Sequence, residues 1–395
     1  MTAPIVPESS GIEIATLFSR YREEFLSRYP QPIEHYSFIH LIESCRTAKL
    51  GGHIQHCGSC DYSKPMYNSC RSRLCPKCQS LKRERWVEAR KQEILPCKYF
   101  HGVFTLPHSV NPIALSNKKL VYRLLFESVS ETLQSFAMKE LHGRLGFISV
   151  LHTWNQKLLD HIHLHCLIPA GALDVKSGAW IPCRSSNFLF PVFALSRVFR
   201  AKFLEKLKEN HGELRLPARI AYLQNPGSFQ DFIDSAWKEE FVVYAKQPFR
   251  GAEQVIEYLG RYVHRTAISN HRLVKLEGDQ VTFKYRDRQD GNQEKLVTLA
   301  AIEFLRRFML HSLPKGLQRI RYHGFLANRS KQKNVDRIYQ ALARRRNIVE
   351  HAPVTAREFI LKRYGRDIAR CPKCESGTLY ESRPVPKARS PCRMR

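Results

Sequence analysis

The hydrophobic positions of the chain recur with two periods, and each period predicts one kind of element. Spacings of three to four residues predict helices, whereas strict alternation predicts strands. Helical patterns cover residues 11–50, 81–94, 116–142, 195–207, 252–268 and 300–311. Strand patterns cover residues 99–107, 147–154, 161–168 and 237–244, and residues 273–285 predict a hairpin that turns at residues 277–279.

The strand at 161–168 carries a histidine at every second position. Alternate side chains of a strand point to opposite faces, so the three imidazoles share one face and the apolar residues between them share the other. Imidazole is the commonest metal ligand in proteins, and a bound ion would offset the packing that this face gives up. The alternative to a metal site is a solvent-facing strand on which the histidines happen to alternate. The preceding predicted strand brings His152 to the same region. The alternating residues are His161, Ile162, His163, Leu164, His165, Cys166 and Ile168.

The predicted helix at 252–268 places two tyrosines one turn apart. Residues four apart are neighbours on a helix, so Tyr258 and Tyr262 lie side by side along the edge of an apolar stripe. Such a pair occurs in cores and interfaces as well as in catalytic sites. Arginines on the adjoining side would draw a phosphate towards both phenols. The stripe is formed by Val255, Ile256, Leu259 and Val263, and the polar side by Gln254, Arg261 and Arg265.

Five of the 12 cysteines lie between residues 57 and 78. Four of them form two Cys-x2-Cys knuckles, Cys57/Cys60 and Cys75/Cys78. Four thiolates close the tetrahedral coordination sphere of zinc and leave no position for substrate water. We therefore expect one structural zinc ion at these four residues. The spare donors that could replace a knuckle cysteine are Cys70, His53 and His56.

Basic residues surround these cysteines, and the chain becomes strongly basic again towards its C-terminus. Arg71 and Arg73 are typical of a knuckle that lies on nucleic acid, although a solvated basic face is the alternative. A further knuckle, Cys371/Cys374, lacks a partner pair, and a second zinc ion would need another donor. After Glu381 we expect a disordered tail. The candidate donors for the further knuckle are Cys392, His351 and His323.

Charge is the strongest signal in the composition. The 395 residues include 64 Lys and Arg against 36 Asp and Glu, which gives a net charge of +28. Such an excess favours a polyanionic partner, most often nucleic acid, with an acidic membrane surface or protein as the alternative. The chain has no apolar run of about 18 residues, so we expect no membrane span. Its first residues lack the pattern of a secretory signal.

Together these stretches resemble the rolling-circle (HUH) insertion-sequence transposases of the two-tyrosine type, which are bacterial proteins with an N-terminal zinc-binding domain. The stretches follow the family's order and extend over most of the chain. The chain departs from the family at Leu74, where a histidine is usual, and at Ile162, where a proline is usual. The matching stretches are Cys57-x2-Cys60 with 68–79, 152–154, 161–169, 258–270 and 319–327.

The resemblance implies metal-assisted cleavage of single-stranded DNA by a tyrosine. His163-Leu164-His165 matches the family motif that holds Mg²⁺ or Mn²⁺ against the scissile phosphate. Either Tyr258 or Tyr262 would attack the phosphorus and leave a 5′-phosphotyrosine with a free 3′-hydroxyl. Two imidazoles do not complete the coordination of such an ion. For a third ligand we favour His152, and the alternatives are His161 and Gln254.

The implied fold is α+β, an antiparallel-sheet endonuclease core flanked by helices, with the histidines on a central strand. A helical, zinc-binding region at 1–95 precedes this core at 96–325, and a basic region follows at 326–395. The implied partners are single-stranded DNA at transposon ends and at the target, in the bacterial cytoplasm at the nucleoid. Because the chain has no Gly-x4-Gly-Lys-Ser/Thr loop, host replication or helicase proteins would unwind the DNA. The arginines expected at DNA are Arg71, Arg73, Arg261 and Arg265.

Two other classes of protein would share some of these features. A non-catalytic zinc-finger protein that binds nucleic acid would account for the charge and the cysteines, but not for the histidine strand. A zinc-dependent hydrolase would use His161, His163 and His165 and would form no covalent intermediate with its substrate.

Overall fold

A five-stranded antiparallel sheet forms the centre of the molecule. The computed structural model describes residues 11–91, 93–174, 176–183, 189–249, 266–287, 289–346 and 354–388, with Gln254, Ile256, Gly260 and Val263. The strand order is β12-β4-β5-β3-β8, so β5 is the middle strand. The bounds are β3 Tyr99–Thr105, β4 Phe147–Trp154, β5 Asp160–Pro169, β8 Val243–Phe249 and β12 Ile320–His323. The expected antiparallel sheet with its histidines on a central strand is confirmed.

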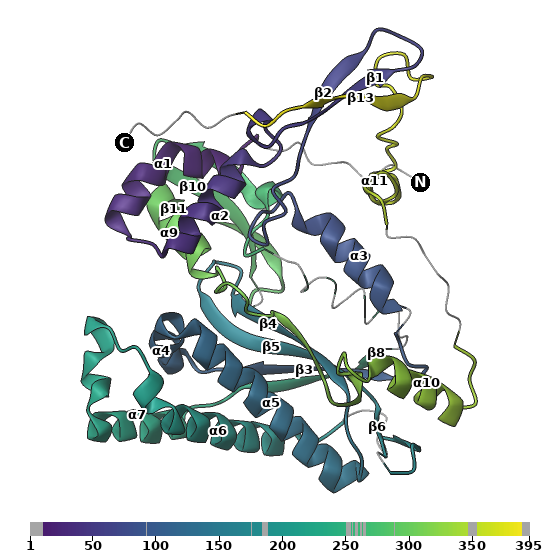
Figure 1. The fold of residues 1–395 in the computed structure, drawn as a ribbon. Helices are drawn as coiled ribbons and strands as arrows, with labels where there is room; N and C mark the ends of the chain where they lie inside the picture. Colours follow the sequence, from purple (N-terminus) through teal and green to yellow (C-terminus); the bar gives the residue numbers. More distant parts are fainter. Residues whose placement is uncertain are drawn as a thin grey trace.

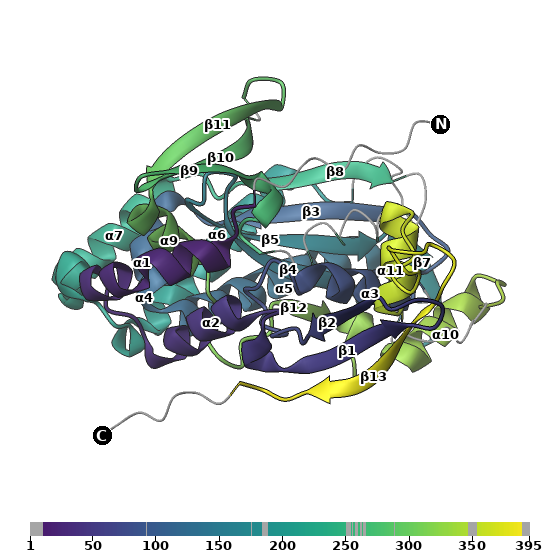
Figure 2. The same ribbon diagram turned by 90° about the horizontal axis from the view of Figure 1, so that it is seen from above.

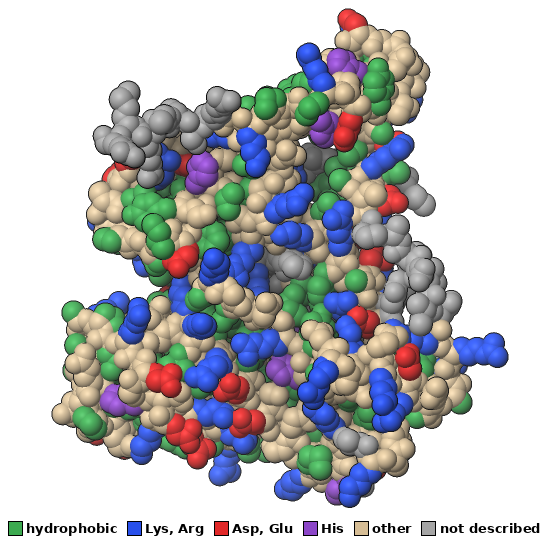
Figure 3. All heavy atoms as spheres, in the orientation of Figure 1, with side chains coloured by type: hydrophobic (Ala, Val, Ile, Leu, Met, Phe, Trp, Pro, Cys, Tyr) green, Lys and Arg blue, Asp and Glu red, His purple; other side chains and the backbone are tan. Residues whose placement is uncertain are grey.

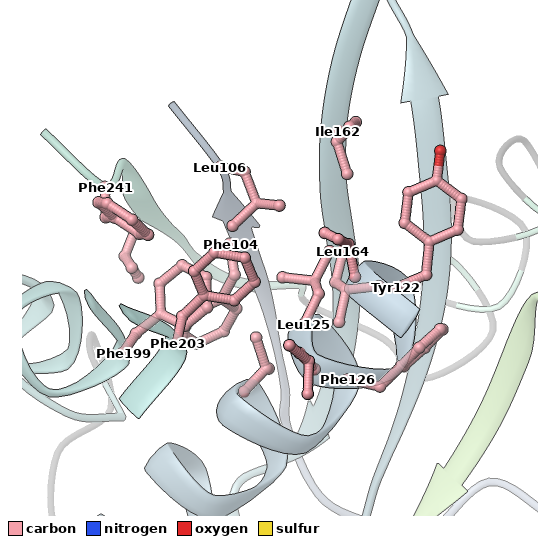
Figure 4. Packing of buried hydrophobic residues seen from close by; sticks show 14 of the residues in the cluster. Phe104, Leu106, Tyr122, Leu125, Phe126, Ile162, Leu164, Phe199, Phe203 and Phe241 are labelled. Carbon is pink, nitrogen blue, oxygen red and sulfur yellow. The ribbon is translucent and has the colours of Figure 1, made fainter. Parts of the chain in front are cut away.

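One face of this sheet is covered by helices, which lie beneath it in Figure 1. Leu164 and Cys166 of β5 point into this layer together with Phe104 of β3. Figure 4 shows Phe104 beside Phe199 and Phe203, and Leu164 near Leu125 and Tyr122, all from the covering helices and the sheet. Burying one such side chain stabilises the fold by about 1.5–3 kcal/mol, so this layer anchors the strands. The helices are α4 Asn111–Ser116, α5 Lys118–Leu141, α6 Val192–Glu209 and α7 Pro226–Lys238.

A second body of helices and strands lies above the sheet in Figure 1. It packs the N-terminal helices against α9 and a three-stranded sheet, and the rings of Phe18 and Phe308 meet edge to face at 6.0 Å. This apolar cluster joins residues 14–78 to residues 267–309, so the regions expected at 1–95 and 96–325 share a core. The division of the chain into domains at 1–95 and 96–325 stays a prediction. The elements are α1 Ile14–Arg28, α2 Ile33–Ser44, β9 Leu273–Glu277, β10 Gln280–Asp287, β11 Gln293–Ala300 and α9 Ala301–Leu310.

A third sheet joins the two ends of the chain, with the strand order β13-β1-β2. Strands β1 (Gly52–Cys57) and β2 (Ser63–Tyr67) form a hairpin, and Figure 2 shows β13 (Leu379–Val385) beside β1. The prediction of a disordered tail after Glu381 is wrong as far as Val385, because β1 supplies that segment with backbone partners. The other elements are α3 Gln79–Lys91, β6 Gly171–Leu173, β7 Trp180–Pro182, α10 Lys331–Ala341 and α11 Ala356–Tyr364, with short 3-10 turns between elements.

The strand predicted at 237–244 is also wrong in its first half. Helix α7 continues to Lys238 because Phe229, Ile233 and Ala236 recur at helical spacing and are buried. The side chain of Asn225 accepts hydrogen bonds from the first turn and fixes the start of this helix. Strand β8 begins only at Val243.

Candidate active site

Three histidines from neighbouring strands converge on the face of the central sheet opposite helices α4–α7. His163 and His165 come from β5, and His152 of β4 lies directly across from His163. Each offers a ring nitrogen, and these atoms all lie within 4.8 Å of one another. The three residues are 4–6% exposed. The alternation of β5 produces this arrangement, because Leu164 and Cys166 between the histidines are held in the helical layer.

Hydrogen bonds to the outer nitrogens orient two of these rings. His163 donates from Nδ1 to the carbonyl oxygen of His161 at 2.8 Å, and this bond fixes its tautomer because the carbonyl only accepts. Nδ1 of His165 lies 3.0 Å from Nε2 of His101 on β3, and the two rings are stacked. The Nε2 atoms of His163 and His165 face each other at 3.1 Å. Bonds of this kind to the outer nitrogen orient metal-ligating histidines in many proteins.

The structure separates His161 from the group of three. Its ring lies against that of His163, with centroids 4.6 Å apart, while its carbonyl oxygen holds His163 in place. Gln254 is exposed. Among the histidines considered for a third ligand, His152 is the one that shares the cluster with His163 and His165. The role of His101 escaped sequence analysis, although Tyr99, His101 and Val103 alternate on β3 as the histidines do on β5.

The donor set suits a divalent ion. The Nε2 atoms of His163 and His165 are 3.1 Å apart, close enough to bind one ion, since adjacent ligands of an octahedral ion with bonds of about 2.1 Å lie about 3.0 Å apart. Three imidazoles leave coordination positions open, which a catalytic ion needs for water or substrate oxygen.

The predicted tyrosine helix lies mostly outside the described residues, and this includes Tyr258, Tyr262, Arg261 and Arg265. Two of its described members pack on the histidine face. Ile256 and Val263 are buried in one cluster with Val150 of β4 and Leu167 of β5. These two positions confirm half of the predicted apolar stripe.

Gly260 shows how closely this segment approaches helix α3. A Cβ atom at Gly260 would lie 2.5 Å from Cγ2 of Val87. Only glycine fits such an approach without moving its neighbour. Gly260 therefore packs against α3, while Ile256 and Val263 pack on the strands that carry the histidines.

The cysteines form two groups rather than one. Cys75 and Cys78 join Cys70 and Cys45, with Sγ of Cys78 3.5 Å from that of Cys45 and 3.6 Å from that of Cys70. Hydrogen bonding, first from Cys70, lowers the pKa of the Cys45 thiol to about 7 and so favours a thiolate. The prediction of one ion shared with Cys57 and Cys60 is therefore wrong, whereas the spare donor Cys70 does join a group.

Cys57 and Cys60 instead join Cys371 and Cys374. The reason is the β1–β2 hairpin, which carries the first knuckle at its tip while Cys45 and Cys70 flank its base. Five residues of strand at about 3.3 Å each hold the tip roughly 17 Å from the base, too far for one ion. The donors suggested for the Cys371 knuckle, Cys392, His351 and His323, are not needed. Two of these, Cys392 and His351, lie outside the described residues, and His323 is engaged by Ser149.

The two arginines near the cysteines differ in their surroundings. Arg71 is exposed. Arg73 is half-buried and donates to the carbonyl oxygens of Leu313, Pro314 and Leu317, and burial lowers its pKa. This arginine therefore ties the cysteine loop to residues 313–317.

Basic side chains gather around the hollow between the upper and lower parts of the molecule in Figure 3. One cleft of about 920 Å³ is lined by residues of α3, α5, β12 and the loop before β12. Aromatic and basic side chains together are what single-stranded nucleic acid requires, because bases stack on rings and phosphates contact cations. These lining residues are Trp86, Tyr322, Lys119, Arg123, Lys315 and Arg321. Among the helices that the structure describes, none is long and apolar enough to cross a membrane.

Comparison with known protein families assigns both the region that carries the histidines and the region that carries the N-terminal cysteines. Residues 146–334, which contain the three clustered histidines, match a family described as "Putative transposase". Residues 17–106 match a family described as "Transposase zinc-binding domain". The fold and the site thus define a transposase with an N-terminal zinc-binding domain.

Relatives extend the match over almost the whole chain. "Putative transposase y4qJ" of Sinorhizobium fredii is 42% identical over 94% of this chain and 94% of its own length. The transposase for insertion sequence element IS801 of Pseudomonas savastanoi pv. phaseolicola is 30% identical over 76% of this chain and 72% of its own. No solved structure matches. The chain belongs to the IS91 family of rolling-circle insertion-sequence transposases, and its substrate is DNA.

Proposed function

We propose that this transposase cleaves and rejoins single-stranded DNA through a covalent bond to tyrosine. The observation that carries the proposal is the buried group of His152, His163 and His165 on the face where Ile256 and Val263 also pack. Tyr258 and Tyr262 are each within two residues of these packed positions in the sequence. A nucleophile beside a metal-ligand cluster is the pairing that phosphoryl transfer to a side chain requires.

The three histidines would hold Mg²⁺ or Mn²⁺, whose charge would stabilise the anionic oxygen of the scissile phosphate. His101 and the carbonyl of His161 orient the rings of His165 and His163, so that both Nε2 atoms point to one place. The buried cluster limits the movement of these rings. Little rearrangement would then be needed when the DNA binds.

In the chemical step, the phenol oxygen of Tyr258 or Tyr262 forms a bond to phosphorus as the bond from phosphorus to the 3′ oxygen breaks. The phenol loses its proton and the departing 3′ oxygen gains one, so a 5′-phosphotyrosine and a 3′-hydroxyl result. Attack by a 3′-hydroxyl on the phosphotyrosine reverses the step and joins a new strand. A second tyrosine one helical turn away would allow two strands to be held in succession.

The DNA strand would be drawn in by the net charge of +28 and by basic residues, with Arg71, Arg261 and Arg265 as the proposed contacts near the zinc domain and the tyrosines. Strand separation would come from host replication proteins, at the nucleoid of the bacterial cell. The zinc-binding domain and the aromatic cleft beside β12 would hold DNA next to the site of cleavage.

A covalent-adduct assay tests this proposal. Labelled single-stranded DNA carrying the ends of the element is incubated with protein and Mn²⁺, then run on a denaturing gel. We expect a labelled band at the size of the protein that requires metal and is lost in the Tyr258→Phe/Tyr262→Phe double variant. The single variants show which tyrosine attacks first. Tyr222→Phe, at a position 63% exposed on a 3-10 turn, serves as the matched control and should retain the band.

Histidine variants distinguish tyrosine transesterification from the two alternatives, a metal-dependent hydrolase and a non-catalytic binding protein. His163→Ala should lower adduct formation on the order of 100-fold or more, because it removes a group that stabilises the transition state. Cleavage without an adduct would instead support a hydrolase that uses the same three histidines. DNA binding with neither cleavage nor adduct would support a non-catalytic binding protein.

A further inference from the structure

Four cysteines from opposite ends of the chain meet at the tip of the β1–β2 hairpin. Cys57 and Cys60 lie at the turn of the hairpin, and Cys371 and Cys374 precede β13. Their Sγ atoms all lie within 4.8 Å of one another. Sγ of Cys57 is 3.7 Å from that of Cys374, and Sγ of Cys60 is 3.7 Å from that of Cys371.

These distances distinguish a metal site from disulfides. A disulfide joins its sulfurs at about 2.05 Å. Four sulfurs placed tetrahedrally around zinc at about 2.3 Å lie about 3.8 Å from one another. The four cysteines therefore have the spacing of zinc ligands.

The backbone around these cysteines is arranged to stabilise thiolates. The amide groups of Ser59, Lys373 and Gly377 donate to the sulfurs of Cys57, Cys371 and Cys374, respectively, over 3.3–3.4 Å. Such bonds favour the charged form of the ligand. The knuckle is also tightly closed, since a Cβ atom at Gly377 would fall 2.3 Å from Sγ of Cys57.

We propose that Cys57, Cys60, Cys371 and Cys374 bind a second structural zinc ion, which fastens the C-terminal segment to the N-terminal zinc-binding domain. Cys371 and Cys374 lie beyond both matched family ranges, which end at residues 106 and 334. The ion adds a link between segments that also pair as β1 and β13. The same segment reaches helix α3, where Lys362 contacts Glu84 and Glu88.

This second ion would complete the domain around a hairpin that has little core of its own. The cluster at the hairpin tip contains only three buried apolar residues among those described, Cys57, Cys371 and Leu379. Small units with so little apolar burial need a metal or a disulfide to hold one structure. Zinc at the tip supplies that stabilisation, and the group at Cys45, Cys70, Cys75 and Cys78 holds the hairpin base.

Metal content of the full-length protein tests the proposal. Protein purified without chelator should contain two zinc ions per chain, one for each four-cysteine group. Cys371→Ser/Cys374→Ser should retain one, and so should Cys45→Ser/Cys78→Ser. Cys183→Ser, which lies outside both groups, is the matched control and should retain two. One zinc ion in the unaltered protein, unchanged in Cys371→Ser/Cys374→Ser, would overturn the proposal, and so would iron in place of the second zinc.

Alkylation of the intact protein gives a readout that does not depend on a variant folding. Cysteines bound to zinc react slowly, so Cys57, Cys60, Cys371 and Cys374 should be protected together and become reactive together when a chelator is added. Protection of Cys57 and Cys60 with Cys371 and Cys374 freely reactive would overturn the proposal. Gly377→Ala should release the same four residues at a lower chelator concentration, because its Cβ displaces the sulfur of Cys57.

Discussion

His101 lies behind His165 with its Nε2 atom 3.0 Å from Nδ1 of that ring, on the side away from His163. His101 is 2% exposed and stands on β3, the strand next to β5. A buried group in this position sets which nitrogen of His165 carries the hydrogen. It is thus a positioning residue for the metal-ligand cluster.

Replacing His101 should weaken the cluster without removing a ligand. We expect His101→Leu to reduce metal affinity and adduct formation about 10–100-fold, the usual effect of losing such a partner. Titration of Mn²⁺ binding by calorimetry measures the first effect and the covalent-adduct assay the second. His142→Asn, at an exposed left-handed position that asparagine tolerates, should behave as the unaltered protein. Full activity at saturating Mn²⁺ and unchanged affinity would contradict the role of His101.

A methyl group at Gly260 should displace the segment that carries the tyrosines. Alanine is the better helix former by about 1 kcal/mol, but its Cβ would overlap Cγ2 of Val87. We expect Gly260→Ala to destabilise this packing by about 1–3 kcal/mol and to reduce adduct yield. Val87→Ala removes the overlapping methyl, so the double variant should recover much of the yield. A double variant no better than Gly260→Ala would show that this contact does not position the segment.

The helical face of β5 should dominate stability. Leu164 is fully buried in the layer formed with helices α5 and α6, and Leu164→Ala should lower the free energy of unfolding by about 2–5 kcal/mol. Urea unfolding followed by circular dichroism measures this loss. Leu296→Ala is the matched control, because Leu296 is 58% exposed on β11 and its truncation should have little effect.

Stability should fall in mild acid because of buried neutral histidines. Burial, the largest cause, lowers the pKa of His311 to about 3, while its ring contacts the carbonyl oxygen of Leu158 at 3.1 Å. Between pH 6.5 and pH 3 the unfolded chain therefore binds a proton that the folded chain excludes. The stabilisation is complete above pH 6.5 and is lost as the pH falls, by up to about 1.4 kcal/mol per pH unit.

Unfolding in urea at pH 7 and pH 4.5 checks this pH dependence. His311→Gln should be less stable at pH 7 yet lose less stability on acidification than the unaltered protein. His142→Asn should leave the pH dependence unchanged, because His142 is exposed. An equally steep acid loss in His311→Gln would assign the effect to other groups, such as His35 and His323, whose pKa values burial lowers to about 4.

Sequence patterns predicted what depends on local geometry. The alternation at 161–168 specified both faces of β5, because the two-residue period of a strand leaves no other arrangement of Leu164 and His165. Which cysteines form a group depends instead on their distances in the folded structure. Nothing in the spacing of Cys57 and Cys60 shows that a hairpin carries them away from Cys75, or that Cys371 returns to meet them.

The same difference explains the roles of Cys45 and His101. Cys45 stands alone in the sequence, and it becomes part of a group only because helix α2 ends beside the loop of Cys75 and Cys78. His101 gains its role from the register between β3 and β5, which neither strand specifies by itself. The comparisons establish the family, whereas the assignment of Tyr258 and Tyr262 as nucleophiles stays a prediction.

The pairing of β1 with β13 can form only after the residues of β13 have been synthesised. Ser382 contacts the backbone of Ile54 across 328 residues of sequence. Ribosomes add roughly 5–20 residues per second, so Ile54 is synthesised roughly 16–66 s before Ser382. During that time one edge of the hairpin has no neighbour from its own chain. Histidines and a glutamine occupy much of β1, a polar composition that discourages association with other nascent chains while the edge is open.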